Sequence, residues 1–362
     1  MKIIHTSDIH LNSKMESSLT QDKAKQRKQE LLFTFNRLVE YAKENNVKAI
    51  LIAGDLFDTE SINKQTAEYV YSLIENNSNI TFLYLCGNHE KRSFLNYIKH
   101  PLKNLVTFDN SWQSCDLGEN VVISGISITK ENCKLLYPEL KLNKDNFNIV
   151  MMHGQTSKYF SEDNFEIVNL TELKNKNINY LALGHIHSYQ EGKLDDNAKY
   201  CYCGCLEGRG FDECGKKGFV ELEIINNKLK TTFVPFAKRE ILEIEVDISG
   251  LTKLKDIDDE ILKSIKDVSK DNLIKVNLVG DIDENTDLNI DFIQNNLNET
   301  YYFVKIENNT KLKIDIEKYK NDISLKGEFI RCVLNGNLSD EEKEVVLMFG
   351  LKALNGEVDL WE

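Results

Sequence analysis

Residues 49–58 read AILIAGDLFD, a fully apolar run of five residues that ends at Gly54-Asp55. A short apolar run closed by glycine is typical of a strand buried on both faces of an α/β sheet. Similar runs recur along the first part of the chain, and each predicts a strand. They lie at Lys2–Thr6, Phe82–Cys86, Val121–Ile128, Phe147–Met152, Tyr180–Leu183, Tyr200–Cys203 and Gly218–Ile225.

Amphipathic stretches separate the first of these strands. Apolar residues at helical spacing predict one helix from about Gln21 to Asn46 and another from Ser61 to Ile74. Strands that alternate with helices are the signature of an α/β domain.

The pattern changes near Pro235, where we place a boundary between domains at 1–235 and 236–362. The second part predicts a small α+β domain. Its expected helices lie at Asp256–Val268 and from Ser339 to Asn355, the latter opened by a capping box with Glu342. Its expected strands lie at Ile241–Ile248, Leu273–Val279, Tyr301–Ile306 and Lys311–Ile316.

Composition limits the class of protein. Hydrophobic residues make up 41% and charged residues 28% of 362 residues, which suits a two-domain globular chain. No apolar run approaches the roughly 20 residues of a membrane span, and the N-terminus is unlike a signal peptide. We therefore expect a cytoplasmic protein that does not engage a membrane, with eight cysteines as free thiols.

The net charge of −13 is unevenly distributed. Residues 236–362 hold 17 Lys and Arg against 28 Asp and Glu, a net of −11, and residues 1–235 hold 28 against 30. Because an acidic surface repels a phosphate backbone, the second domain is not expected to bind nucleic acid through bulk charge.

Five short polar motifs begin where apolar runs end. In an open α/β sheet, ligand-binding side chains collect beyond the carboxyl ends of the strands, so these motifs should meet at one edge. The motifs are Asp8-Ile9-His10, Gly54-Asp55, Gly87-Asn88-His89-Glu90, His153-Gly154 and Gly184-His185-Ile186-His187.

Each motif alone has an ordinary explanation, because aspartate in a turn is usually a cap. Five of the seven histidines, however, lie in these motifs. Carboxylate, amide and imidazole groups without a thiolate suit two divalent cations such as manganese, iron, zinc or magnesium. Two ions roughly 3.5–4 Å apart activate water for in-line attack at phosphorus. The sequence therefore predicts a two-metal phosphoesterase.

The motif series resembles the calcineurin-like metallophosphoesterases, and within them the SbcD-type DNA exonucleases, the nuclease subunits of double-strand-break repair. HTSDIHL at 5–11 and AGDLFD at 53–58 match that branch, and the resemblance covers about residues 1–225. It implies a four-layered α/β/β/α sandwich with a smaller C-terminal α+β capping domain. It also implies exonuclease or endonuclease cleavage of DNA, in repair or recombination, by a metal-bridged hydroxide.

The resemblance also implies roles for single residues. It makes His89 the catalytic histidine that contacts the phosphate, and it favours two manganese ions as cofactors. It implies one ion held by Asp8, His10, Asp55 and His187, and a second held by Asp55, Asn88, His153 and His185. Arg92, directly after the third motif, and Arg209, in a glycine-rich segment, are candidate substrate contacts.

The partners implied by the resemblance are DNA, an SbcC-like coiled-coil ATPase and a second copy of the chain. The acidic C-terminal domain or its last helix would be the docking surface for the ATPase. The basic segment Lys23–Lys28 is expected to be a solvated helix face, and dimer contacts near it are the alternative. Asp58 stands where relatives often have histidine, and a turn role is as plausible as a functional one.

Two other functions remain open. A phosphatase or phosphodiesterase acting on nucleotides or phosphoproteins would use the same metals. A non-enzymatic scaffold of this fold would not need the full set of ligands that this chain retains. Zinc binding competes with free thiols at one further cluster, where free thiols are favoured. Its members are Cys201, Cys203, Cys205 and Cys214.

Overall fold

The computed structural model describes residues 1–15, 17–58, 62–86, 100–157, 166–283, 286–313, 319 and 322–354. The chain forms two compact units, Met1–Ile241 and Leu242–Glu362. Each unit has its own hydrophobic core.

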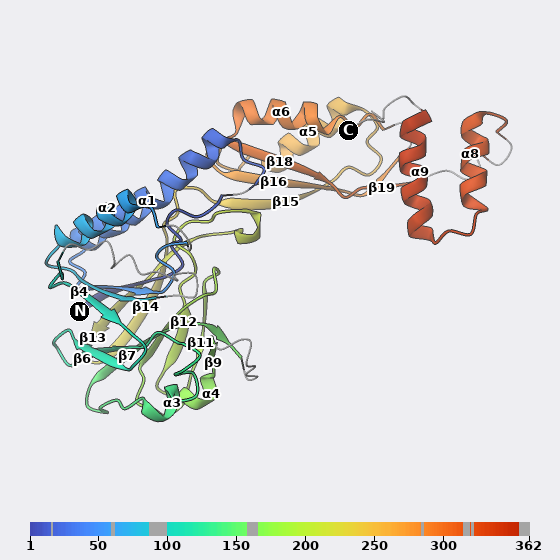
Figure 1. Ribbon diagram of the computed structural model, residues 1–362. Coiled ribbons are helices and arrows are strands. Elements are labelled where there is room, and N and C mark those ends of the chain that lie inside the picture. The colour runs from blue at the N-terminus through green and yellow to red at the C-terminus, as the bar shows by residue number, and fades with distance from the viewer. Residues whose placement is uncertain are drawn as a thin grey trace. The chain divides into compact units, whose positions relative to one another are not determined.

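Two six-stranded sheets form the first unit (Figure 1). The first sheet has the order β14-β13-β1-β2-β3-β4, in which β1 to β4 run parallel and β13 and β14 are antiparallel additions. Its strands are β1 (Lys2–Thr6), β2 (Ala49–Ala53), β3 (Thr81–Leu85), β4 (Leu105–Phe108), β13 (Gly218–Ile225) and β14 (Lys228–Pro235).

The second sheet has the order β11-β12-β10-β7-β6-β5, with β6, β7, β10 and β12 parallel. Its strands are β5 (Gln113–Asp116), β6 (Val121–Gly125), β7 (Phe147–His153), β10 (Tyr180–Gly184), β11 (Gln190–Lys193) and β12 (Lys199–Tyr202). A small separate ribbon pairs β8 (Gln155–Thr156) with β9 (Ile167–Val168).

The layers follow from which face of each strand is apolar. Side chains such as Leu51 and Ile149 fill the space between the two sheets. The opposite face of the first sheet packs on α1 (Gln21–Glu44) and α2 (Lys64–Glu75), and that of the second on α3 (Leu136–Glu139) and α4 (Leu170–Leu173). The expected four-layered α/β/β/α sandwich is therefore confirmed (Figure 1).

Helix α1 begins where the Thr20 hydroxyl accepts a hydrogen bond from the Lys23 backbone N–H. Its apolar stripe, which includes Leu31, Phe35 and Leu38, faces the first sheet. The expectation of a solvated basic face is wrong for Arg27, which is fully buried and bound to Glu30 and Glu207. Charged residues are rarely buried unless they are paired, so the sequence favoured an exposed position for Arg27. Helical spacing alone does not show the partners that allow its burial.

The second unit contains the sheet β15-β16-β18, built from β15 (Ile241–Asp247), β16 (Leu273–Val279) and β18 (Phe303–Asn308). Helices α5 (Leu254–Ile265) and α6 (Ile290–Thr300) pack on it. Two short strands, β17 (Asp281–Ile282) and β19 (Lys311–Leu312), pair in parallel. Helices α8 (Leu325–Leu334) and α9 (Asp340–Leu354) share a separate small core.

Most strand and helix expectations agree with these bounds to within a few residues. The capping box is confirmed, because Ser339 and Glu342 each accept a hydrogen bond from the other's backbone N–H. Some elements were not predicted: helices α3, α4, α6 and α8, the edge strands β4, β5, β11 and β14, and the two-residue strands β8, β9 and β17. Edge strands are less apolar than central ones, so their sequence signal is weaker. None of the helices in the described part of the chain has the length and apolar composition to span a membrane.

Candidate metal centre

The predicted site residues follow neighbouring strands. Asp8 comes just after β1 and Asp55 just after β2, which are adjacent in the first sheet. His153 ends β7, and His185 and His187 follow β10, its neighbour in the second sheet. Because parallel strands present their carboxyl ends at one edge, these motifs meet there. Asn88, His89 and Arg92 come after β3 but lie outside the described residues.

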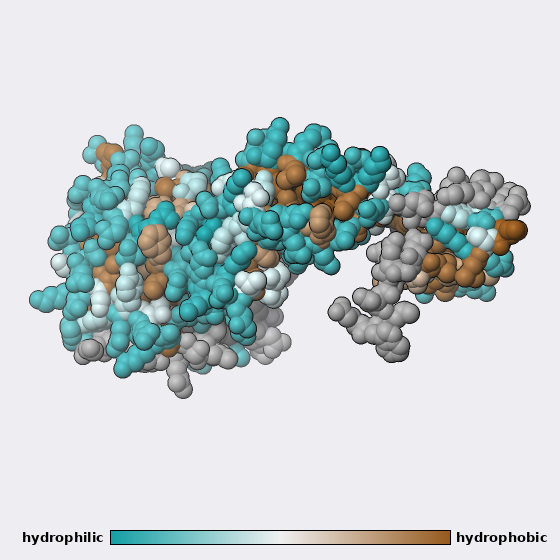
Figure 2. Space-filling view, turned by 90° about the horizontal axis from the view of Figure 1, so that it is seen from above, coloured by the Kyte–Doolittle hydropathy of each residue, from teal (hydrophilic) through white to brown (hydrophobic). Residues whose placement is uncertain are grey.

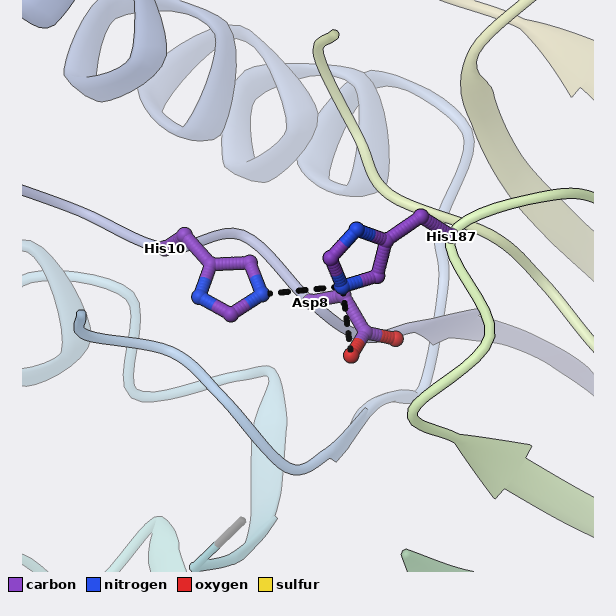
Figure 3. A group of neighbouring side chains, drawn as sticks. All are labelled: Asp8, His10 and His187. Carbon is purple, nitrogen blue, oxygen red and sulfur yellow. Dashed lines mark hydrogen bonds and ion pairs between the residues drawn. The ribbon is translucent and has the colours of Figure 1, made fainter. Parts of the chain in front are cut away.

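The first group of converging side chains consists of Asp8, His10 and His187, whose ligand atoms all lie within 4.8 Å of one another. The Nε2 atoms of His10 and His187 are 3.2 Å apart, and His187 Nε2 lies 3.7 Å from Asp8 Oδ1. Figure 3 shows both imidazole rings turned toward each other beside the carboxylate. Residues from two different sheets thus direct their ligand atoms into one small space.

The second group consists of Asp8, Asp55 and His153, again within 4.8 Å. Asp8 belongs to both groups. Asp55 Oδ2 lies 3.4 Å from His153 Nε2 and 3.8 Å from His10 Nε2, so it also approaches the first group. His185 is close by, with its ring centroid 5.4 Å from that of His153. Its backbone N–H donates to both carboxylate oxygens of Asp8, at 3.0 and 3.1 Å.

The backbone is left-handed at several of these positions. Asp8, His10 and Asp55 have φ near +50°, and His185 has φ of 103°. A left-handed non-glycine residue costs roughly 1–2 kcal/mol, and such conformations cluster at functional sites. Hydrogen bonds from Asp8 N to Gly54 O and from His10 N to Asp55 O, at 3.1 and 3.0 Å, hold two of them in place.

Two glycines make room for the His153 ring. A Cβ at Gly54, where φ is +95°, would lie 2.2 Å from His153 Nδ1. A Cβ at Gly184 would lie 2.7 Å from the same atom and 1.9 Å from the Ala53 carbonyl oxygen. Larger side chains at either position would therefore displace this histidine.

In His153 and His187, the hydrogen bond made by Nδ1 determines the tautomer of the ring, and so whether Nε2 presents a lone pair to the site. His153 Nδ1 lies 2.8 Å from the Ala53 carbonyl, which can only accept, so Nδ1 carries the proton. His187 Nδ1 lies 2.6 Å from Glu213 Oε1 in the same way. Each Nε2 then faces the aspartate carboxylates, as in histidine metal ligands. Inward lone pairs beside two carboxylates fit a divalent cation.

The pKa values of two histidines are shifted in opposite directions. Burial lowers the pKa of His10 to about 4, with the nearby Arg209 charge acting in the same direction. Burial also acts to lower the pKa of His153, but the hydrogen bond and the charge of Asp55 outweigh it and raise the pKa to about 9. Metal binding requires both rings to be deprotonated at Nε2, so protons compete with metal here.

Arg209 lies next to this site with its donors bound inside the protein. Its Nε and Nη2 bind Glu213, its Nη1 lies 3.1 Å from Ser13 Oγ, and Asp58 is 3.9 Å away. The substrate contact inferred for Arg209 stays a prediction. Sequence reasoning missed Glu213, because no motif or spacing links it to a histidine 26 positions earlier.

The cysteine cluster does not gather around a common point. All eight cysteines are free thiols, as expected. Cys203 Sγ lies 3.0 Å from Ser7 Oγ, whereas Cys205 contacts Glu213 and Cys214 contacts the Phe211 carbonyl. Among the described residues, the groups able to hold a metal contain only Asp and His.

Comparisons with known proteins agree with this geometry. A family model described as calcineurin-like phosphoesterase matches residues 1–189. A DNA double-strand break repair protein Mre11 from Sulfolobus acidocaldarius is 22% identical over 372 residues, covering 96% of this chain and 94% of the relative. The protein of the same name from Thermoplasma acidophilum is 24% identical over 305 residues, covering 78% of each.

A solved dimetal phosphatase from Danio rerio aligns with 64% of this chain and 95% of its own, at 8% identity and a TM-score of 0.44.

Proposed function

We propose that this chain, which belongs to the calcineurin-like phosphoesterase family, is a metal-dependent nuclease that hydrolyses phosphodiester bonds in DNA. The observation that carries the proposal is the convergence of aspartate and histidine ligand atoms that follow the carboxyl ends of strands in both sheets. Similarity to two Mre11 repair proteins over most of the chain supports DNA as the substrate.

Asp55 is a member of both proposed ligand sets. Asp8, His10, Asp55 and His187 would hold one, and Asp55, Asn88, His153 and His185 the other. Asp55 Oδ2 lies within 4 Å of a histidine nitrogen from each set, so this carboxylate could belong to both sets. When bound, such a metal pair lowers the pKa of water and stabilises charge developing at phosphorus. Manganese suits this mixture of oxygen and imidazole donors.

The protein's own residues would orient and protect the reacting groups. Asp8 is 1% exposed and Asp55 1% exposed, so their charges lie in a poorly solvated setting where electrostatic interactions are strong. His89 is proposed to contact the phosphate and the leaving oxygen. Such positioning contributes more to catalysis when the surrounding groups are preorganised. The backbone at Asp8 and His10 is preorganised in this sense, because hydrogen bonds hold it in place.

The second unit is proposed as a capping and partner-docking domain, with the boundary near Pro235. Helices α8 and α9 expose Leu325, Val345 and Phe349, which are 73%, 51% and 57% accessible. Figure 2 shows hydrophobic side chains on the surface of this C-terminal part. An SbcC-like ATPase is the proposed occupant, since exposed apolar patches mark interaction sites.

A homodimer is proposed through the first two helices. Phe33 on α1 and Tyr69 on α2 are exposed, at 54% and 43%. Their helices contact each other, so the two aromatic side chains belong to one packed pair of helices. Sedimentation of Phe33→Ser beside wild type at micromolar concentration tests this, and a strictly monomeric wild type would contradict it.

A pair of histidine variants tests the nuclease proposal. Purified protein with Mn²⁺ is assayed on double-stranded DNA, single-stranded DNA and an aryl phosphodiester. His153→Ala should lose at least 100-fold of the DNA activity, because the site loses one ligand. His100→Ala, an exposed histidine paired with Glu75, is the matched control and should cut normally.

Two outcomes would count against the proposal. Cleavage of the small diester without cleavage of DNA would favour the phosphatase or phosphodiesterase alternative. A His89→Ala variant that cuts as fast as wild type would refute the assigned role of His89.

A further inference from the structure

The segment Cys205–Lys217, here called the clamp segment, surrounds His187 on two sides. Its members contact both the ring and the backbone of this histidine. We propose that Glu213 is a positioning residue that sets the tautomer and orientation of His187, and that Arg209 holds Glu213 in place. The inference rests on the metal site proposed above, to which it adds the part that orients one ligand.

The contact to the ring is short and buried. Glu213 Oε1 lies 2.6 Å from His187 Nδ1, and the Glu213 side chain is only 3% exposed. A carboxylate accepts, so the proton stays on Nδ1 and the lone pair of Nε2 points toward Asp8 and His10. Loss of this acceptor would let the ring rotate or change tautomer, because His187 itself is partly open to solvent.

Arg209 binds the same carboxylate, and its Nη2 lies 3.2 Å from His187 Nδ1. Its Nε and Nη2 donate to Glu213 Oε1 at 3.0 and 2.6 Å, and its backbone N–H donates to Oε2 at 2.8 Å. A buried carboxylate is costly unless paired in this way. Four donors from two residues therefore leave the Glu213 side chain a single orientation, aimed at His187.

The His187 backbone is held by the same segment. Lys217 Nζ donates to the His187 carbonyl at 2.8 Å, and the Cys205 N–H approaches the same oxygen at 3.3 Å. Lys217 is 3% exposed although it carries an ammonium group. Ring and main chain of one proposed ligand are thus anchored by a segment that supplies no ligand of its own.

The chemistry predicts an effect on one metal and not on both. A negatively charged partner at Nδ1 makes Nε2 a stronger electron-pair donor to a metal. Loss of such a partner typically lowers metal affinity by about 10- to 100-fold. His187 belongs to the proposed first ligand set only. His153, in the second set, takes its outer hydrogen bond from the Ala53 carbonyl instead. Removing Glu213 should therefore weaken one of two sites.

The test is a titration of the metal-free full chain with Mn²⁺. Binding is measured by calorimetry and by the electron paramagnetic resonance signal of free Mn²⁺. Wild type should bind two ions. Glu213→Gln keeps the shape of the side chain and should weaken one site 10- to 100-fold while the other is unchanged. Asp212→Asn, which removes the same charge one position away on an exposed residue, is the control and should match wild type.

A second readout needs no metal. Nitrogen-15 NMR of the histidine rings reports the tautomer of His187, which should be protonated at Nδ1 in wild type and should become mixed in Glu213→Ala. An unchanged tautomer in that variant, or equal weakening of both sites in Glu213→Gln, would overturn the inference. Wild type that binds no Mn²⁺ would instead refute the proposed metal site, so the two failures are distinguishable.

Discussion

Glu30 on α1 lies at the centre of a buried network of charged side chains, and its replacement by glutamine tests that network directly. Arg27 Nη1 lies 2.5 Å from Glu30 Oε2, and Lys238 Nζ and Arg239 Nη2 lie 2.9 and 2.8 Å from Oε1. Burial would raise the pKa of Glu30, but hydrogen bonds from these three cations outweigh it and lower the pKa to about 2.

The shift converts to a stability contribution that depends on pH. The pKa falls from 4.5 to about 2, and one pKa unit corresponds to about 1.4 kcal/mol, so the network contributes about 3 kcal/mol at neutral pH. A folded pKa below the unfolded value means that this stabilisation is complete above pH 5. It is lost as pH falls through the window from about 4.5 to about 2.

Denaturant unfolding at pH 7 and at pH 3 measures the effect. Glu30→Gln should unfold about 3 kcal/mol more easily than wild type at pH 7, because it leaves buried cations without their partner. The difference should shrink at pH 3. Glu40→Gln changes an exposed carboxylate on the same helix and should be near neutral. Equal differences at both pH values would refute the reasoning.

Three further outcomes are expected. Gly184→Ala should destabilise the chain by about 1–3 kcal/mol and abolish Mn²⁺ binding, because its Cβ would lie 1.9 Å from the Ala53 carbonyl and 2.7 Å from the His153 ring. Gly336→Ala, whose Cβ meets nothing closer than 3.3 Å, is its control in thermal unfolding and calorimetry. Mn²⁺ at 100 times its dissociation constant should stabilise wild type by about 2.7 kcal/mol in thermal unfolding, and a metal-independent melting temperature would contradict the site. Ser339→Ala should cost about 1 kcal/mol through the lost cap of α9, read as reduced helicity of that segment by hydrogen exchange.

Much of the fold was readable from the sequence because the signals are local. An apolar run such as Ala49–Ala53, closed by glycine, is typical of a strand buried on both faces, and the structure places it in the middle of the first sheet. Helix α6 was missed although Ile290, Ile293 and Leu297 have helical spacing, since the polar residues between them dilute the pattern.

The candidate site was predicted unevenly. Asp8, Asp55 and His153 lie together in space, as the rule that strand ends share an edge predicts, and their role as metal ligands stays a prediction. Asn88 and His89 rest on sequence alone. Arg27 was wrongly placed on a solvated face, because nothing in the order of residues shows that Glu207 would lie beside it.

The order of residues by itself determined the apolar central strands, where each of them stops and which chemical groups follow it, because these depend on neighbours within one turn or one strand. Only the tertiary structure decided which groups meet. Glu213 binds His187, and Arg27 lies between Glu30 and Glu207, because the packing of two sheets and a helix brings together residues that are distant in sequence. Contacts of this kind have no periodicity, so the chain must fold before they can be seen.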